Sequence, residues 1–184
     1  FVHRDIKPSN LMLAETVGAD GNPQAIVKLL DLGLARVFEQ RASGDVGESA
    51  ELTSAGQIMG TLDYMAPEQG SDSHQVDIRT DIYSLGATLY KFLSGEAPFA
   101  EHAGKAPMQR LMAIATQEAR PVTSRCPAIP EKLANVVHRM LEKDPARRFQ
   151  TPLEVSKAIE EFTSGACLIE LLQPGVRSKT EPVK

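Results

Sequence analysis

The opening stretch VHRDIKPSNLML contains several charged and polar side chains, whereas a buried core strand would contain mainly apolar ones. Arg4, Asp5 and Lys7 stand almost in a row, and such residues are rarely buried in a strand. The proline that follows lacks the backbone N–H that a central strand needs. A carboxylate, an ammonium group and the amide of Asn10 can together exchange protons and bind ions. The stretch is therefore interpreted as a loop that carries chemistry, followed by a strand.

Four more short motifs follow in order along the chain. They are DLG at Asp31 to Gly33, GTLDYMAPE at Gly60 to Glu68, DIYSLG at Asp81 to Gly86 and KDPARRF at Lys143 to Phe149. With the opening H-R-D-x-K-P-x-N pattern, they resemble the C-terminal lobe of a eukaryotic-type (Hanks-type) serine/threonine protein kinase over residues 1–163. The residues of DIYSLG and GTLDYMAPEQ resemble those of bacterial members of that family. A chance match to the six fixed positions of the opening pattern has a probability on the order of a few in a million.

The resemblance implies a catalytic role for the opening loop. Phosphoryl transfer needs positioning and electrostatic stabilisation rather than covalent chemistry by the protein. By resemblance, Asp5 orients the substrate hydroxyl and accepts its proton, and Lys7 neutralises charge on the γ-phosphate of ATP. Asn10 and Asp31 would supply oxygen ligands to Mg²⁺, a hard cation. Met12 falls where the family places an apolar floor under adenine, although an ordinary core methionine is an alternative interpretation.

Other matching residues are expected to be regulatory or structural. Arg4 resembles the arginine that holds a phosphorylated activation loop, and Thr53 and Ser54 are the expected phosphorylation sites in the segment before Thr61. Ser43 and Ser49 are more remote alternative sites, and solvated loop hydroxyls are the alternative interpretation. Lys7 and Thr61 resemble the serine/threonine branch of the family. The residues with implied structural roles are His3, Asp81, and the ion pair of Glu68 with Arg148.

The elements that must position these residues are predicted from local patterns. Short β-type runs at 10–13 and 25–31 predict a hairpin with a long tip, and Asn10 and Asp31 should meet across it. Apolar spacing predicts a buried helix over 80–95, ended by a glycine, and amphipathic helices over 107–119 and 130–143. Thr151, Pro152 and Glu154 form a capping box that begins a last helix. The expected fold is α+β, a mainly helical kinase C-terminal lobe with a short β-hairpin at the catalytic loop, and residues 164–184 are a tail or linker.

Composition sets limits on other classes of function. The chain has 184 residues, 42% of them hydrophobic, enough for one sizeable core. A formal net charge of −4 argues against a nucleic-acid backbone as the main partner. Cys126 and Cys167 are too far apart in sequence to indicate a disulfide framework or a zinc site, which suits a reducing, cytoplasmic setting. No apolar run is long enough to span a bilayer.

Half of a kinase nucleotide site is not found in this sequence. No G-x-G-x-x-G occurs, and the N-terminal lobe is expected upstream of Phe1. The predicted function is transfer of the γ-phosphate of ATP to Ser/Thr hydroxyls of protein substrates, with Mg²⁺, by a longer parent protein. The 184-residue chain alone is expected to be inactive. The alternative is a pseudokinase or scaffold that uses the fold as a binding module.

Overall fold

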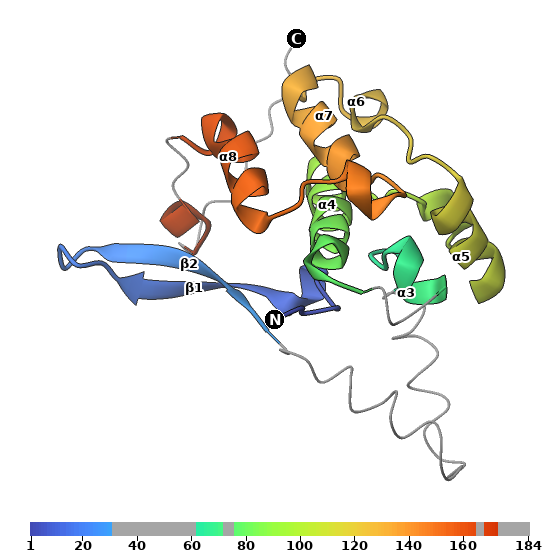
Figure 1. Ribbon diagram of the computed structural model, residues 1–184. Coiled ribbons are helices and arrows are strands. Elements are labelled where there is room, and N and C mark those ends of the chain that lie inside the picture. Colours follow the sequence, from blue (N-terminus) through green and yellow to red (C-terminus); the bar gives the residue numbers. More distant parts are fainter. Residues whose placement is uncertain (31–61, 72–75, 165–167, 173–184) are drawn as a thin grey trace, which may run out of the picture.

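The computed structural model describes residues 1–30, 62–71, 76–164 and 168–172. In this part of the chain a two-stranded sheet lies to one side of a group of helices that surrounds α4 (Figure 1). The two strands are β1 (Leu11–Val17) and β2 (Pro23–Leu29). The α-helices are α3 (Pro67–Ser71), α4 (Ile78–Ser94), α5 (Pro107–Thr116), α6 (Val122–Arg125), α7 (Glu131–Met140) and α8 (Pro152–Thr163). Short 3₁₀ helices are η1 (Pro8–Asn10), η3 (Ala100–His102), η4 (Pro145–Arg147) and η5 (Leu168–Leu172). This composition is mainly helical with a small sheet, in agreement with the expected α+β class.

The hairpin directly follows the opening loop. The strands pair antiparallel from Leu11 opposite Leu29 to Val17 opposite Pro23. The connecting tip is therefore shorter than the sequence predicts, because the pairing continues through residues that were assigned to the turn. Gly21, at φ 79°, supplies the left-handed conformation that closes the tip.

Helix α4 begins and ends at well-defined caps. The Asp77 carboxylate accepts a hydrogen bond from the Arg79 N–H at 2.8 Å, and Gly95 ends the helix in the left-handed region at φ 83°. Most of the helix is buried, as predicted. Phe92 is the exception, because its side chain is 59% exposed rather than part of the predicted apolar face.

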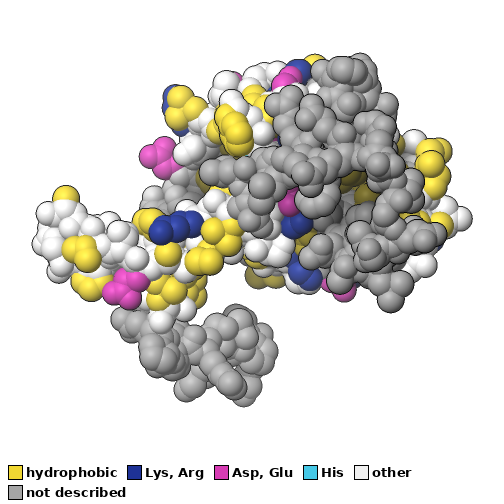
Figure 2. All heavy atoms as spheres, turned by 90° about the horizontal axis from the view of Figure 1, so that it is seen from below, with side chains coloured by type: hydrophobic (Ala, Val, Ile, Leu, Met, Phe, Trp, Pro, Cys, Tyr) yellow, Lys and Arg dark blue, Asp and Glu magenta, His cyan; other side chains and the backbone are white. Residues whose placement is uncertain are grey.

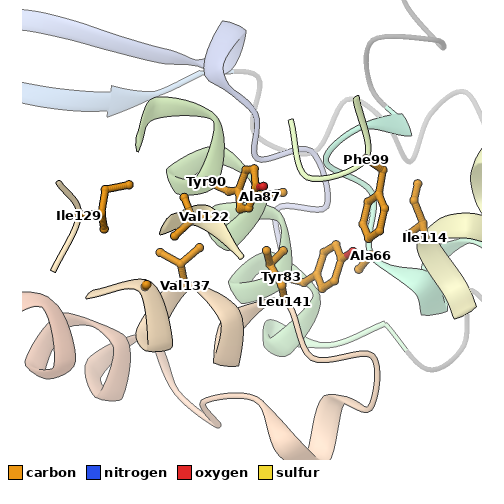
Figure 3. Packing of buried hydrophobic residues seen from close by; sticks show 11 residues of the cluster. Ala66, Tyr83, Ala87, Tyr90, Phe99, Ile114, Val122, Ile129, Val137 and Leu141 are labelled. Atoms are coloured by element: carbon orange, nitrogen blue, oxygen red, sulfur yellow. The ribbon is translucent and has the colours of Figure 1, made fainter. Parts of the chain in front are cut away.

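The main hydrophobic core lies between α4 and the helices that follow it. Figure 3 shows Ala87 and Tyr90 of α4 near Val122 of α6 and Val137 of α7, and Tyr83 of α4 beside Leu141. A second cluster, formed by Ile82, Met140, Phe149 and Val155, joins α4 and α7 to α8. Helix α4 therefore contacts apolar side chains on two sides, which fixes the polar residues at its N-terminal end.

The C-terminal elements pack back toward the hairpin. Thr151 Oγ1 caps α8 by accepting from the Glu154 N–H at 3.2 Å. The Glu154 carboxylate accepts from the backbone N–H of Gln150 at 2.9 Å, one residue before the cap position of a standard capping box. Beyond α8, η5 lies against β2 and β1, an element that the sequence patterns do not predict (Figure 1). None of the helices in the described ranges has the length and apolar character needed to cross a membrane.

Candidate active site

The backbone of the opening loop is held by a carboxylate at the start of α4. The two oxygens of Asp81 accept hydrogen bonds from the backbone N–H groups of His3 and Arg4, each at 2.7 Å. Asp81 is only 6% exposed, so these bonds form in a setting with little competing water. Arg4 has φ 69°, which is uncommon for a residue with a side chain. The loop is thus fixed in a strained conformation by a residue far along the chain.

Two polar side chains of the loop converge on the Asp5 carboxylate. The Lys7 ammonium lies 2.9 Å from Oδ2 of Asp5. The Asn10 amide nitrogen donates to the same oxygen at 2.9 Å and to the Asp5 carbonyl at 2.8 Å. The Asp5 and Lys7 side chains keep 23% and 20% of their surface exposed, whereas Asn10 is buried. The Asp5 carboxylate is therefore oriented by Lys7 and the buried Asn10, and it remains accessible to solvent.

The buried ring of His3 connects this loop to the end of the hairpin. Its Nε2 lies 3.0 Å from the carbonyl oxygen of Leu30, and its Nδ1 lies 3.3 Å from the backbone nitrogen of Asp5. A carbonyl can only accept, so Nε2 carries the proton and Nδ1 accepts from Asp5. The Leu30 N–H in turn donates to the Asn10 carbonyl at 2.8 Å. Asn10 therefore lies beside Leu30, the residue that directly precedes Asp31 in the chain.

A buried ion pair braces the other side of α4. Arg148 and Glu68 form a two-bond pair at 2.7 and 2.9 Å, and Thr80 donates its hydroxyl to Glu68 at 2.8 Å. Burial by itself would raise the pKa of Glu68, but the hydrogen bonds and positive charge of Arg148 outweigh it and hold the pKa below its ordinary value. Glu68 is therefore ionised at neutral pH.

Sequence reasoning missed two further polar links to residues 62–71. The Gln69 amide donates to the carbonyl of Arg4 at 3.0 Å, and Arg110 of α5 forms a salt bridge with Asp63. Gln69 directly follows the APE motif, but nothing in its sequence context indicates a partner in the opening loop. Arg110 is buried in a helix that was predicted to be amphipathic. An arginine at a buried helical position indicates an ionic partner, and it is the only signal of this salt bridge.

Several predicted site residues lie elsewhere. Met12 is in β1 and is 48% exposed, so its predicted contact with adenine stays a prediction. Figure 2 shows further hydrophobic side chains on the hairpin, and Val17 and Val27 are among the exposed ones. The remaining predicted residues, Asp31, Thr53, Ser54 and Thr61, fall outside the described residues.

The donor atoms suit a hard cation rather than a soft one. Within the described ranges, no group of three or more His, Cys, Asp or Glu side chains could hold a metal ion. The Asn10 amide nitrogen is directed to Asp5, so its amide oxygen is the atom that could ligate a cation. Amide and carboxylate oxygens are ligands that Mg²⁺ accepts, so the Asn10 oxygen suits that ion, while the second predicted ligand, Asp31, lies outside the described residues.

Comparison with known proteins places the chain in a family. A family model described as "Protein kinase domain" matches residues 1–160. Similar proteins include serine/threonine-protein kinase PknJ of Mycobacterium tuberculosis, 39% identical over 85% of this chain and 24% of the relative. Serine/threonine-protein kinase PknB of Mycobacterium leprae is 33% identical over 90% of this chain and 23% of the relative. The chain thus spans about a quarter of the length of the curated relatives it matches. It belongs to the protein kinase domain family and resembles the bacterial serine/threonine kinases within it.

Proposed function

We propose that the protein to which this chain belongs transfers the γ-phosphate of ATP to serine or threonine hydroxyls of protein substrates. The observation that carries the proposal is the Asp5 carboxylate, fixed at 2.9 Å by both the Lys7 ammonium and the Asn10 amide. This arrangement holds a proton acceptor and a cation side by side at a partly exposed site. The names of the bacterial relatives support the same chemistry.

Each side chain has a distinct task in this proposal. Asp5 accepts a hydrogen bond from the substrate hydroxyl and takes its proton as the oxygen attacks phosphorus. Lys7 places its positive charge where the transferred group accumulates negative charge. The Asn10 oxygen and the Asp31 carboxylate would hold Mg²⁺, which neutralises phosphate charge when bound. His3 and Asp81 keep the loop backbone in place through the hydrogen bonds described above.

We further propose that the described residues form the C-terminal lobe and that residues outside this chain complete the ATP site. Large apolar side chains on the hairpin side support this, because Phe1 is 89% exposed and Val27 is 56% exposed. A mostly apolar cavity of about 240 Å³ lies between Phe1 and Ile6, the end of β2, and helices α4 and α8. Apolar surface of this kind is usually covered by another part of a protein.

The test is a phosphorylation assay on the full-length parent with Mg-ATP and a general protein substrate. Asp5→Asn should lower turnover by roughly 10²- to 10⁴-fold, the usual range for a positioned general base. The matched control is Asp20→Asn, because Asp20 carries an exposed carboxylate at the hairpin tip and, among the described residues, bonds to the nearby Asn22. Wild-type activity in the Asp5 variant would contradict the assignment of Asp5. A folded wild-type parent that transfers no phosphate would favour the scaffold alternative.

A further inference from the structure

The side chain of Gln69 bridges two segments that are distant in sequence. Its Nε2 donates to the carbonyl oxygen of Arg4 at 3.0 Å, and its Oε1 accepts from the backbone N–H of Ala66 at 2.9 Å. An amide group can do both at once because it carries a donor and an acceptor on neighbouring atoms. Gln69 therefore connects the opening loop to the segment that leads into α3.

The bond to Arg4 fixes one particular peptide plane. The carbonyl of Arg4 and the N–H of Asp5 belong to the same planar peptide unit. Gln69 holds the carbonyl end of this plane, and Nδ1 of His3 accepts from the N–H end at 3.3 Å. The orientation of this plane sets ψ of Arg4 and φ of Asp5, and thereby the direction in which the Asp5 side chain leaves the backbone.

This peptide needs support because the residue before it is strained. Arg4, at φ 69°, lies in the left-handed region, which is unfavourable for a residue with a side chain. Asp81 holds the N–H of Arg4 at 2.7 Å, and Gln69 holds its carbonyl. Without the Gln69 bond, the plane that follows Arg4 is held at its N–H end alone, and its rotation about ψ of Arg4 and φ of Asp5 would turn the Asp5 carboxylate.

We propose that Gln69 is a positioning residue for the reaction: it orients the Asp5 carboxylate through the Arg4–Asp5 peptide and ties that orientation to the segment Leu62–Ala66. This inference rests on the proposed function. The same segment is anchored to α5 by the salt bridge between Asp63 and Arg110. A displacement of residues 62–66 is thus transmitted to the catalytic carboxylate by one side chain.

Two substitutions in the full-length parent separate the two bonds of Gln69. Gln69→Glu keeps an oxygen that can accept from Ala66 but faces the Arg4 carbonyl with a second acceptor. Gln69→Met has a similar length and loses both bonds. The matched control is Gln150→Met, because Gln150 also donates its amide to backbone carbonyls, those of Pro145, Ala146 and Arg148, away from Asp5.

Steady-state kinetics and thermal unfolding are measured for all four proteins. Both Gln69 variants should lose roughly 5- to 50-fold in kcat, since small misplacements of a catalytic group are costly, while the KM for ATP changes less than about twofold. Gln150→Met should keep its kcat, although its melting temperature falls by about as much as that of Gln69→Met, roughly 2–4 °C.

The outcomes distinguish this inference from the function on which it rests. An active parent with unchanged kcat in Gln69→Glu overturns the positioning role. A loss of kcat that is equal in Gln69→Met and Gln150→Met also overturns it, because it would follow general stability. An inactive wild-type parent overturns the proposed function and this inference together.

Discussion

Removing Arg148 should destabilise the fold more than removing its ionic partner Glu68. The Arg148 guanidinium donates to both oxygens of Glu68 and also to the backbone carbonyls of Glu142, Arg79 and Lys143, at 2.7 to 3.1 Å. Its side chain is fully buried, so no water can replace these bonds. In Arg148→Met three carbonyls lose the Arg148 donor at the same time, and the Glu68 carboxylate keeps the Thr80 hydroxyl but loses its cationic partner.

The magnitude follows from which groups lose a partner. Breaking a buried pair by removing one member costs about 3–5 kcal/mol. We expect Arg148→Met to cost about 5 kcal/mol, because three carbonyls lose a donor as well, and Glu68→Met to cost about 3 kcal/mol, because Arg148 keeps its three carbonyl acceptors. The double variant should cost about as much as Arg148→Met alone, which gives a coupling energy of about 3 kcal/mol in magnitude.

Urea unfolding of the parent protein, followed by circular dichroism at 222 nm, measures these differences. This chain contains no tryptophan whose fluorescence could be followed. Circular dichroism is suitable because it reports the helices directly. Gln150→Met is a control for a residue of the same region whose side chain is exposed. If Arg148→Met costs less than about 1 kcal/mol, or no more than Glu68→Met, then the hydrogen bonds to the carbonyls do not contribute as argued.

Three further changes test other parts of the structure. Burial lowers the pKa of Lys143 from 10.5 to about 8, so the unfolded state binds this proton more tightly than the folded state. The free energy of unfolding of the wild type should therefore rise between pH 8 and 10. Lys143→Met should lack that rise when urea unfolding is measured at both pH values. Burial also lowers the pKa of His138 below 6.5, so this group destabilises the fold as the pH falls below 6.5, and His138→Gln should flatten the dependence of the melting temperature on pH there. Gly86→Ala would place a Cβ 2.7 Å from the Met140 side chain and should cost roughly 1–3 kcal/mol of unfolding free energy, whereas Gly70→Ala, with its nearest atom at 3.4 Å, should cost much less.

The four longer helices could be predicted because their signals are local, whereas the short helices α3 and α6 were not predicted. Gly95 after an apolar repeat and Thr151 before a proline mark a helix end and a helix start, and both lie where predicted. The hairpin ends could not be predicted in the same way. Glu15 and Thr16 have polar side chains that suit a turn, but pairing with Ala25 and Gln24 satisfies their backbone groups and extends the strand.

In the candidate site, too, the contacts that are local in sequence could be predicted, and the contacts between distant segments could not be predicted from local patterns. Asp5, Lys7 and Asn10 are close in sequence, so their convergence depends on one short loop and is indicated by spacing alone. The contacts of Asp81 and Gln69 with this loop span 77 and 65 residues. They depend on how α3 and α4 pack, and no periodicity or turn signal in the sequence encodes that arrangement. The resemblance to a known family indicated Asp81, whereas Gln69 is found only from the structure.

The short helix α3 joins the two halves of this arrangement through neighbouring residues. Glu68 is bonded to Arg148, within the part of the fold that contains α7 and α8, and Gln69 is bonded to Arg4 in the opening loop. Because the two side chains are adjacent on one turn of helix, a shift of α3 that weakens one link strains the other. The buried ion pair then contributes more than stability, since it fixes the point from which Gln69 holds the Arg4–Asp5 peptide. On this argument Glu68→Met should lower kcat as Gln69→Met does, even at temperatures where the variant is fully folded.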